Sequence, residues 1–388
     1  MNNNRLVIFI GSLITGSIIT SPASATRTNE KFEDYMAKIC VYSAEPITDP
    51  ELFVFCDKAF PGSIYDGSAS FSSATNPSSA AGLSSSIGGN QKEEVEKHLE
   101  QREKDATGSW GLLLAASNGE ADRAETEFEN AYGAKDSALI LGLDYSPTSS
   151  FIIGFALGNS ENDIKFTEII GSSKSDNDSK TIYATWTPIN ELSFDIYKGR
   201  VSSSIDSTKY ATFGSNIEGE ITSSSTSEED IAGLSINWDK TIAQFILGVF
   251  IAKDISETDI DPYSENGDTD LELSYGHQKY DSDLTSAGVK LGYIIGFDNV
   301  SLIPSVRFSK VQENKNDSQT IDAHLILLPD EAPFTLTTDA PDRDFYHSEF
   351  SLVLAFNNNS QLFFQYEKKS EHLYLEESAV NAGAVIAF

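Results

Sequence analysis

The chain has 388 residues, of which 39% are hydrophobic and 22% are charged, so it is long enough for one large or two ordinary domains and shows no sign of global disorder. Its formal net charge is -32 at pH 7. This acidity argues against a nucleic-acid-binding protein, which calls for a basic patch, and would help to keep an exported protein soluble.

The first residues have the order of a secretory signal peptide. Arg5 precedes an apolar run from Leu6 to Ile19, and small residues follow up to Ala25. We expect residues 1–25 to be removed by cleavage between Ala25 and Thr26. The alternative is a retained membrane anchor, for which the run is shorter than the roughly 20 residues that a membrane helix needs.

Residues 26–60 are expected to form a small helical module. Apolar residues recur at helical spacing on both sides of a polar loop, which predicts two short helices. The chain has two cysteines, Cys40 and Cys56, and a pair in an exported chain most often forms a disulfide. The hairpin has little apolar surface, so we expect the disulfide to hold it together. It is either a displayed or plugging module or a vestigial leader.

Two segments of different character follow the module. Residues 61–89 are rich in Ser, Gly and Ala and predict a flexible linker. Residues 90–107 contain strong helix formers, with Glu93 and Lys97 four positions apart in the favourable order. This helix is either solvated on all sides or enclosed in a polar lumen.

Residues 108–388 read as about twelve strands. In the hairpin formed by residues 138–158, bulky residues such as Leu139 and Leu141 alternate with residues such as Ile140 and Asp144. The bulky face is either the core of a soluble sandwich or the lipid-facing side of a transmembrane barrel.

The connections between the strands favour the barrel. Short turns alternate with long polar segments, which is the layout of bacterial outer-membrane barrels. The short turns are expected near Pro147, Ile189, Lys240, Asp298 and Asn358. The long segments are expected as loops at 118–136, 159–179, 202–230, 253–284 and 312–343. The predicted fold is therefore all-β, a closed antiparallel barrel of about twelve strands with the helix in its lumen.

The stretch "LGLDYSPTSSFIIGFALGNSENDIKF" and the terminal "GAVIAF" carry a resemblance to a known family. Both are similar to parts of the translocator barrel of autotransporters, a resemblance that extends over residues 91–388. It implies an outer-membrane pore that carries its own N-terminal segment to the cell surface. It also implies that the last strand is read by the barrel assembly machinery, through Val380, Ala382, Ala384, Ile386 and Phe388.

Two features depart from the usual pattern of that family. Residues 26–89 are too short for the long β-helix that many members export, and they contain no internal repeats. Asn90 stands alone where members that cleave their passenger inside the barrel have a pair of Asn residues, so we expect no such cleavage. The expected partners are outer-membrane lipid, the assembly machinery and periplasmic chaperones, with no nucleic acid, and the barrel is expected to be a monomer.

Charged and polar residues on the inward phase of the strands should line the lumen, because a lipid-facing charge costs several kcal/mol. These residues are Asp195, Tyr197, Lys290, Arg307, Glu349 and Glu367. We expect them to pair with one another and with helix charges around Lys97 and Arg102. The alternative is a role in selecting a solute or substrate.

Two further functions have weaker support. Acidic residues in the segment 253–283 could bind a divalent cation, but they lack the spacing of a calcium loop, and a solvated loop is the better interpretation. The acidic candidates are Asp259, Asp261, Glu265 and Asp268. A barrel hydrolase would use a histidine near the outer loops, namely His277, His324 or His372, but no hydrolase motif accompanies them.

We therefore expect no enzyme, no metal and no cofactor. The predicted function is export or surface display of the short N-terminal segment. The alternative is a small-solute channel with the N-terminal module as a periplasmic plug.

Overall fold

The computed structural model describes most of the chain from residue 108 onwards and parts of the N-terminal region. The described residues are 32–36, 39–40, 50–59, 71–72, 108–167, 169–214, 216–315, 317–328, 333–357 and 359–388. The expected signal peptide (1–25), most of the linker (61–89) and the expected lumenal helix (90–107) lie outside them. Within the described ranges, no helix has the length and apolar character needed to cross a membrane.

Twelve long antiparallel strands form a closed barrel, which confirms the predicted fold class. Pairing of the last strand with the first closes the ring, from Leu375 opposite Arg123 to Ala387 opposite Gly111. The strands are β2 (Trp110–Arg123), β3 (Tyr132–Thr148), β4 (Phe151–Phe166), β5 (Gly171–Ile189), β6 (Leu192–Phe213), β7 (Ile217–Ile242), β8 (Phe245–Ile260), β11 (Gln278–Tyr293), β13 (Val300–Glu313), β16 (Asp344–Phe356), β17 (Ser360–Ser370) and β18 (Leu375–Ala387).

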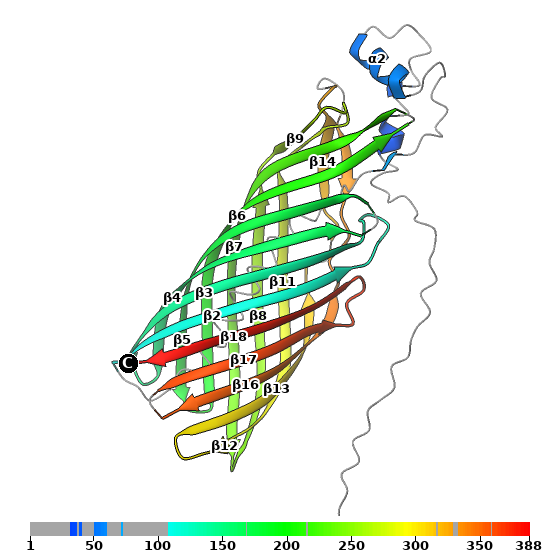
Figure 1. Ribbon diagram of the computed structural model, residues 1–388. Helices are drawn as coiled ribbons and strands as arrows, with labels where there is room; N and C mark the ends of the chain where they lie inside the picture. The colour runs from blue at the N-terminus through cyan, green and yellow to red at the C-terminus, as the bar shows by residue number, and fades with distance from the viewer. Residues whose placement is uncertain are drawn as a thin grey trace, which may run out of the picture.

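The two ends of the barrel differ. One end, here called the turn rim, carries five short connections together with the C-terminus. They follow Thr148, Ile189, Ile242, Gly296 and Phe356. At the other end, here called the far end, β6 and β7 extend well beyond their neighbours (Figure 1). The turn expected at Lys240 lies instead after Ile242, because Thr241 and Ile242 continue the ladder with β8 and Ala243 takes the left-handed conformation.

The outer face of the barrel has the apolar band that lipid requires. Leu139 is 56% exposed, whereas Ile140 is 2% exposed, so the hairpin has the phase expected from the sequence. Aromatic pairs lie on this face beside the turn rim, as in the interfacial belts of membrane proteins. They are Trp110 with Tyr145, Trp186 with Phe194, and Phe245 with Tyr293, with ring centroids 5.0–5.4 Å apart.

Aromatic rings cover glycines on the inner face and fix neighbouring strands to one another. The ring of Tyr183 on β5 lies over Gly154 on β4, and the ring of Tyr197 on β6 lies over Gly233 on β7. A Cβ atom at Gly154 would come within 2.5 Å of the Tyr183 ring, so only glycine permits this approach. These contacts fill space on the inner face beside buried aliphatic side chains such as Leu113 and Ile140.

The long polar segments expected as loops are mostly strand, which corrects the sequence interpretation. β6 and β7 continue through the segment 202–230 with an unbroken register from Leu192 opposite Trp238 to Phe213 opposite Ile217. Arg200 on the outer face forms a bidentate ion pair with Asp230, with both N–O distances 2.8 Å. A charged pair on the outer face lies beyond the hydrocarbon region of the membrane. Strands at this level do not need apolar side chains on their outer face.

A second sheet grows from the far end, and we call it the far-end sheet. It consists of the outer parts of β6 and β7 with four short strands, β9 (Tyr263–Gly267), β10 (Leu273–Tyr275), β14 (Thr320–Leu325) and β15 (Phe334–Thr337). β9 pairs with β7 and β10, and β14 pairs with β10 and β15. β1 (Phe71–Ser72) pairs with the outer end of β6, and the two-residue β12 (Ile295–Gly296) leads into the turn at 297–299.

The N-terminal module packs on the far-end sheet, at the opposite end of the barrel from the C-terminus (Figure 1). It contains helical residues at 32–36 and 39–40 and the helix α2 (Pro50–Ala59). The predicted disulfide between Cys40 and Cys56 is confirmed. The expectation that the disulfide alone supports the hairpin is wrong, because Phe32, Met36 and Phe55 are buried against the sheet.

A charged side chain on the outer face should destabilise the barrel by an amount that depends on its level in the membrane. Phe155 and Asp163 both point outwards from β4, Phe155 within the apolar band and Asp163 beyond it. Phe155→Arg should lower the free energy of unfolding by about 2–4 kcal/mol, because it places a guanidinium in hydrocarbon. Asp163→Arg places the charge in water, opposite Lys135 and Lys174, and should lower it by no more than about 1 kcal/mol. Urea unfolding in lipid vesicles measures both, and equal losses would contradict the assigned band.

Candidate functional site

The candidate site is the lumen, whose wall is made by every second residue of the twelve barrel strands. The residues expected there lie on the inner face. Asp195, Tyr197 and Glu367 are buried, and Lys290, Arg307 and Glu349 are half-buried. Asp195 and Tyr197 both lie on β6. The other four form a row of direct cross-strand neighbours on β11, β13, β16 and β17, namely Lys290, Arg307, Glu349 and Glu367. The predicted residues therefore form two groups on the inner face.

Asp195 on β6 is the acceptor of a buried hydrogen-bond network. Its carboxylate accepts hydrogen bonds from Thr185 on β5 at 2.7 Å, and from Ser235 and Asn237 on β7 at 3.1 and 2.6 Å. Donors on both flanking strands satisfy the charge, which makes its burial tolerable. The network ties three neighbouring strands together from inside the barrel.

Tyr197, Arg307 and Lys290 each contact a side chain two strands away along the ring. The Tyr197 hydroxyl donates to Asp254 at 2.8 Å. The guanidinium of Arg307 lies 3.6 Å from the centre of the Phe250 ring, which is a cation–π contact. Lys290 Nζ lies 3.9 Å from an oxygen of Asp239.

The two glutamates lie opposite each other on β16 and β17, and Glu349 is also opposite Arg307 on β13. Glu367 accepts a hydrogen bond from Asn381 at 2.7 Å and lies 3.4 Å from His347 Nε2. Gln365 donates to Glu349 at 3.3 Å. Wall residues therefore satisfy much of the lumen charge, while the expected helix partners around Lys97 and Arg102 lie outside the described residues.

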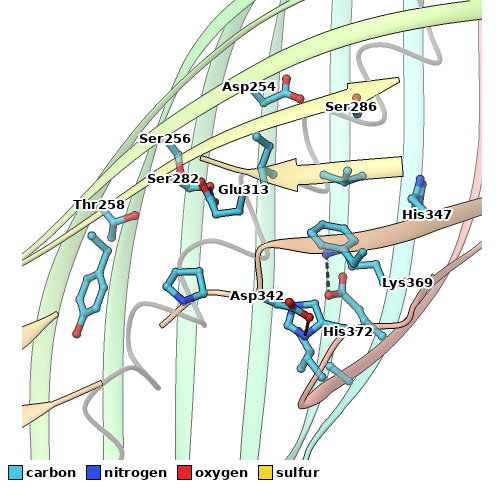
Figure 2. Close-up of a pocket in the computed structure, with 18 of the residues that line it drawn as sticks. Asp254, Ser256, Thr258, Ser282, Ser286, Glu313, Asp342, His347, Lys369 and His372 are labelled. Atoms are coloured by element: carbon cyan, nitrogen blue, oxygen red, sulfur yellow. Dashed lines mark hydrogen bonds and ion pairs between the residues drawn. The ribbon is translucent and has the colours of Figure 1, made fainter. Parts of the chain in front are cut away.

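A cavity of about 460 Å³ lies inside the barrel towards its far end. Figure 2 shows polar side chains from several strands pointing into it, among them Asp254, Glu313 and His347. Glu313 is buried and accepts hydrogen bonds from the Ser282 hydroxyl at 2.5 Å and from the Asp283 backbone N–H at 2.8 Å. The cavity lining therefore combines these acids with bases such as Arg307 and with apolar side chains such as Ile231.

His372, one of the histidines considered for hydrolysis, borders this cavity in the connection between β17 and β18. Its Nδ1 lies 3.4 Å from Asp342 Oδ2 (Figure 2). Phe345 and Tyr374 pack against its ring. Burial lowers the pKa of His372, an effect that Asp342 partly offsets, so the neutral imidazole is favoured. The aromatic contacts and the carboxylate hold the ring in place in the wall of the far end.

The other two histidines also lie at the far end, in separate places. His277 Nε2 is 3.3 Å from Asp259, and His324 belongs to β14 of the far-end sheet. Among the residues that the structure describes, no group of three His, Cys, Asp or Glu side chains is placed to hold a metal ion.

The acidic segment proposed as a possible cation site is divided among separate partners. Asp261 accepts a hydrogen bond from Thr226. Glu265, expected on a solvated loop, is buried in the far-end sheet, where it pairs with Lys209 at 2.6 Å and accepts a hydrogen bond from Tyr275. Pairing of β9 with β7 and β10 puts it there, a long-range contact without a local sequence signal.

Glu229 is a buried acid that the sequence analysis did not single out. It lies on the inner face of β7, 1% exposed, and its flanking residues Glu228 and Asp230 are exposed on the outer face, beyond the apolar band. Burial raises the pKa of Glu229 to about 8, although a hydrogen bond from Ser256 opposes this shift. Its carboxyl is therefore largely protonated at neutral pH.

The sequence analysis also missed an apolar surface, the face of the far-end sheet that contacts the N-terminal module. Phe213, Ile217 and Ile221 supply part of it from within the segment expected to be a polar loop. A period-two pattern is present there, since residues 211, 213, 217 and 221 are apolar and buried. The surrounding Ser, Thr and Glu residues obscure it.

Comparison with known proteins gives a family and a shared fold. Residues 113–367 match the family described as "Autotransporter beta-domain". The chain is similar to the translocator domain of the autotransporter NalP from Neisseria meningitidis, with a TM-score of 0.60 and 12% identity over 80% of this chain and 98% of that one. It is also similar to the beta domain of the Bordetella autotransporter BrkA, with a TM-score of 0.51 and 15% identity over 72% and 99%. A search of curated proteins found no match.

The Asp195 network predicts a measurable contribution to stability. Asp195→Ala removes the acceptor of three hydrogen bonds and should lower the free energy of unfolding by about 1–3 kcal/mol, because the Asn237 amide loses its charged partner. Asp163→Ala, on the exposed outer face, is the matched control and should change it by less than about 0.5 kcal/mol. Urea titration followed by tryptophan fluorescence gives both values. Similar losses in the two variants would contradict the network.

Glu229 predicts a pH dependence of stability. The folded-state pKa of about 8 lies above the ordinary value of 4.5, so the folded protein binds more protons between these pH values and its stability falls as pH rises through them. Glu229→Gln cannot titrate and removes this dependence. The free energy of unfolding of the variant, relative to that of the wild type, should therefore increase as the pH rises from 5 to 8.5. Parallel pH profiles for the two proteins would contradict a raised pKa.

Proposed function

The chain belongs to the autotransporter beta-domain family and is an outer-membrane translocator, and we propose that its cargo is its own N-terminal segment, residues 26–89, which it holds at the cell surface. In bacterial outer-membrane barrels the short turns face the periplasm and the longer connections face outwards. The turn rim is therefore periplasmic, and the far end is extracellular.

The observation that carries this proposal is the position of the disulfide-linked module. Its buried residues contact the far-end sheet, whereas the first barrel strand begins at the turn rim, where Trp110 exchanges two backbone hydrogen bonds with Phe388. The chain thus begins outside the lipid band at one end and enters the barrel at the other. In a membrane, the connection between these two points has to pass through the lumen.

The length of the intervening chain is consistent with such a passage. Residues 60–107 separate α2 from the barrel, and an extended chain spans about 3.3 Å per residue, against an apolar band of about 25 Å. We infer that the segment 90–107, with its Lys and Arg residues, fills the lumen opposite the acidic wall. The signal peptide of residues 1–25 would deliver the chain to the periplasm.

The channel alternative, with the module as a periplasmic plug, is not favoured. A plug would contact the turn rim or the lumen from the periplasmic side, whereas the module contacts the opposite end. Assembly of a closed twelve-stranded barrel implies help from the outer-membrane assembly machinery and from periplasmic chaperones, and we propose these as partners of a monomeric barrel.

An epitope tag between Ala25 and Thr26 tests the proposal. Antibody should label the tag on intact cells, because the module lies on the extracellular side. A matched control has the same tag between Ser149 and Ser150, in a turn of the turn rim, and should be labelled only after the outer membrane is permeabilised. If the first tag also needs permeabilisation while the barrel is folded, the module is not displayed.

A further inference from the structure

We propose that the far-end sheet is a docking surface for the exported module, and that the module stays bound to it when the chain between them is cut. This inference rests on the proposed function, since it concerns where the cargo goes after transport. It makes the cargo a noncovalently held cap on its own translocator, rather than a segment tethered only through the lumen.

The far-end sheet has an apolar face, and the module covers it. Five of its strands, β6, β7, β10, β14 and β15, contribute buried side chains to a single cluster with the module. The members from the sheet are Ala211, Phe213, Ile217, Ile221, Leu273, Tyr275, Ile321, Ala323, Leu325 and Leu336. Without the module, these residues would form a contiguous apolar patch exposed to water outside the cell. Such patches on proteins mark binding sites or cause aggregation.

The module matches this face with its own aromatic residues. Phe55 of α2 is stacked on Phe213 with ring centroids 6.2 Å apart, and Phe32 meets the edge of the same ring at 6.1 Å. On the other side, Phe334 of β15 contacts Phe32 at 5.9 Å and Tyr35 at 4.9 Å. Phe213 is 0% exposed, so both helical segments of the module converge on this one side chain.

Polar contacts fix the position of the module at the edge of the cluster. The Asn216 side chain, in the connection between β6 and β7, donates a hydrogen bond to the carbonyl of Lys58 at 3.2 Å. Lys58 lies in the last turn of α2, where carbonyls have no partner within the helix. Downstream of the module, β1 adds to the edge of β6 with Phe71 opposite Phe213. Docking therefore uses helix packing, a helix C-terminal contact and strand addition.

The module needs this surface because it cannot form a core by itself. α2 has ten residues, and a helix of this length is marginal alone in water. The disulfide joins the two helical segments, and both Cys40 and Cys56 are buried in the same cluster. The disulfide thus gathers Phe32, Met36 and Phe55 on one face, and the sheet supplies the other half of the core.

The test uses the full-length protein with a tag at Thr26 and a specific protease site inserted between Ser78 and Ser79, downstream of β1. After cleavage of the purified protein in detergent, the tagged fragment should co-elute with the barrel in size-exclusion chromatography. Separation of the fragment from a barrel that remains folded would overturn the docking proposal, whether or not the module is displayed in cells.

Two variants and a matched control identify the surface. Phe213→Ala on the sheet and Phe55→Ala on the module should each speed dissociation of the cleaved fragment at least about tenfold, since each removes a buried ring. Phe53→Ala changes a ring on the same helix that is 55% exposed and should leave dissociation unchanged. Phe213→Ala leaves the module sequence intact, so a folding defect of the module does not explain its release. Equal retention in all three variants would overturn the proposal.

The same cleavage on intact cells separates docking from display. Cleavage by added protease with the tagged fragment retained in the cell pellet supports both. Cleavage with release of the fragment into the medium would overturn docking and leave display standing. Protection of the site until the outer membrane is broken, together with co-elution of the purified fragment, would overturn display and leave the docking contact standing.

Discussion

Closure of the backbone hydrogen-bond ladder is the constraint on which the rest of this structure depends. Lipid offers no hydrogen-bonding partner to a free strand edge, so the pairing of β18 with β2 is required for the barrel to exist in a membrane. Once the ring is closed, the alternation of side chains follows. Bulky residues such as Leu141 face lipid, whereas Asp195 and Glu367 face inwards, where Thr185, Asn237 and Asn381 donate hydrogen bonds to them.

Beyond the lipid this constraint relaxes, and the same strands serve a different purpose. Arg200 and Asp230 occupy the outer face of β6 and β7 at a level where lipid would exclude them, and further out Phe213 and Ile217 turn an apolar face towards the N-terminal module. The barrel strands therefore continue without a break from a membrane wall into one half of a second core beyond the lipid. The module completes this core, so the barrel and its N-terminal segment share one structure there.

The sequence predicted the barrel well because membrane strands carry their own signal. The sequence predicts the alternation from Leu139 to Tyr145 and the short turns, and it places Tyr197 and Arg307 on the inner face. It does not predict the strands beyond the lipid. In the segment 202–230, Ser, Thr and Glu residues obscure the alternation of apolar residues, so the sequence predicts a loop there. Glu265 was placed in solvent because its partner Lys209 belongs to a strand more than fifty residues earlier.

The sequence by itself determined that this chain is an exported all-β barrel with a disulfide-linked N-terminal module, because the alternation of residues, the placement of turns and a pair of cysteines are local properties. Only the tertiary structure decided where that module lies. Its partners are Phe213 at the end of β6 and Leu273 and Phe334 from two separate connections between barrel strands, and they form one surface only after the strands have paired. A docking face assembled from distant segments by long-range pairing leaves no continuous pattern in the sequence.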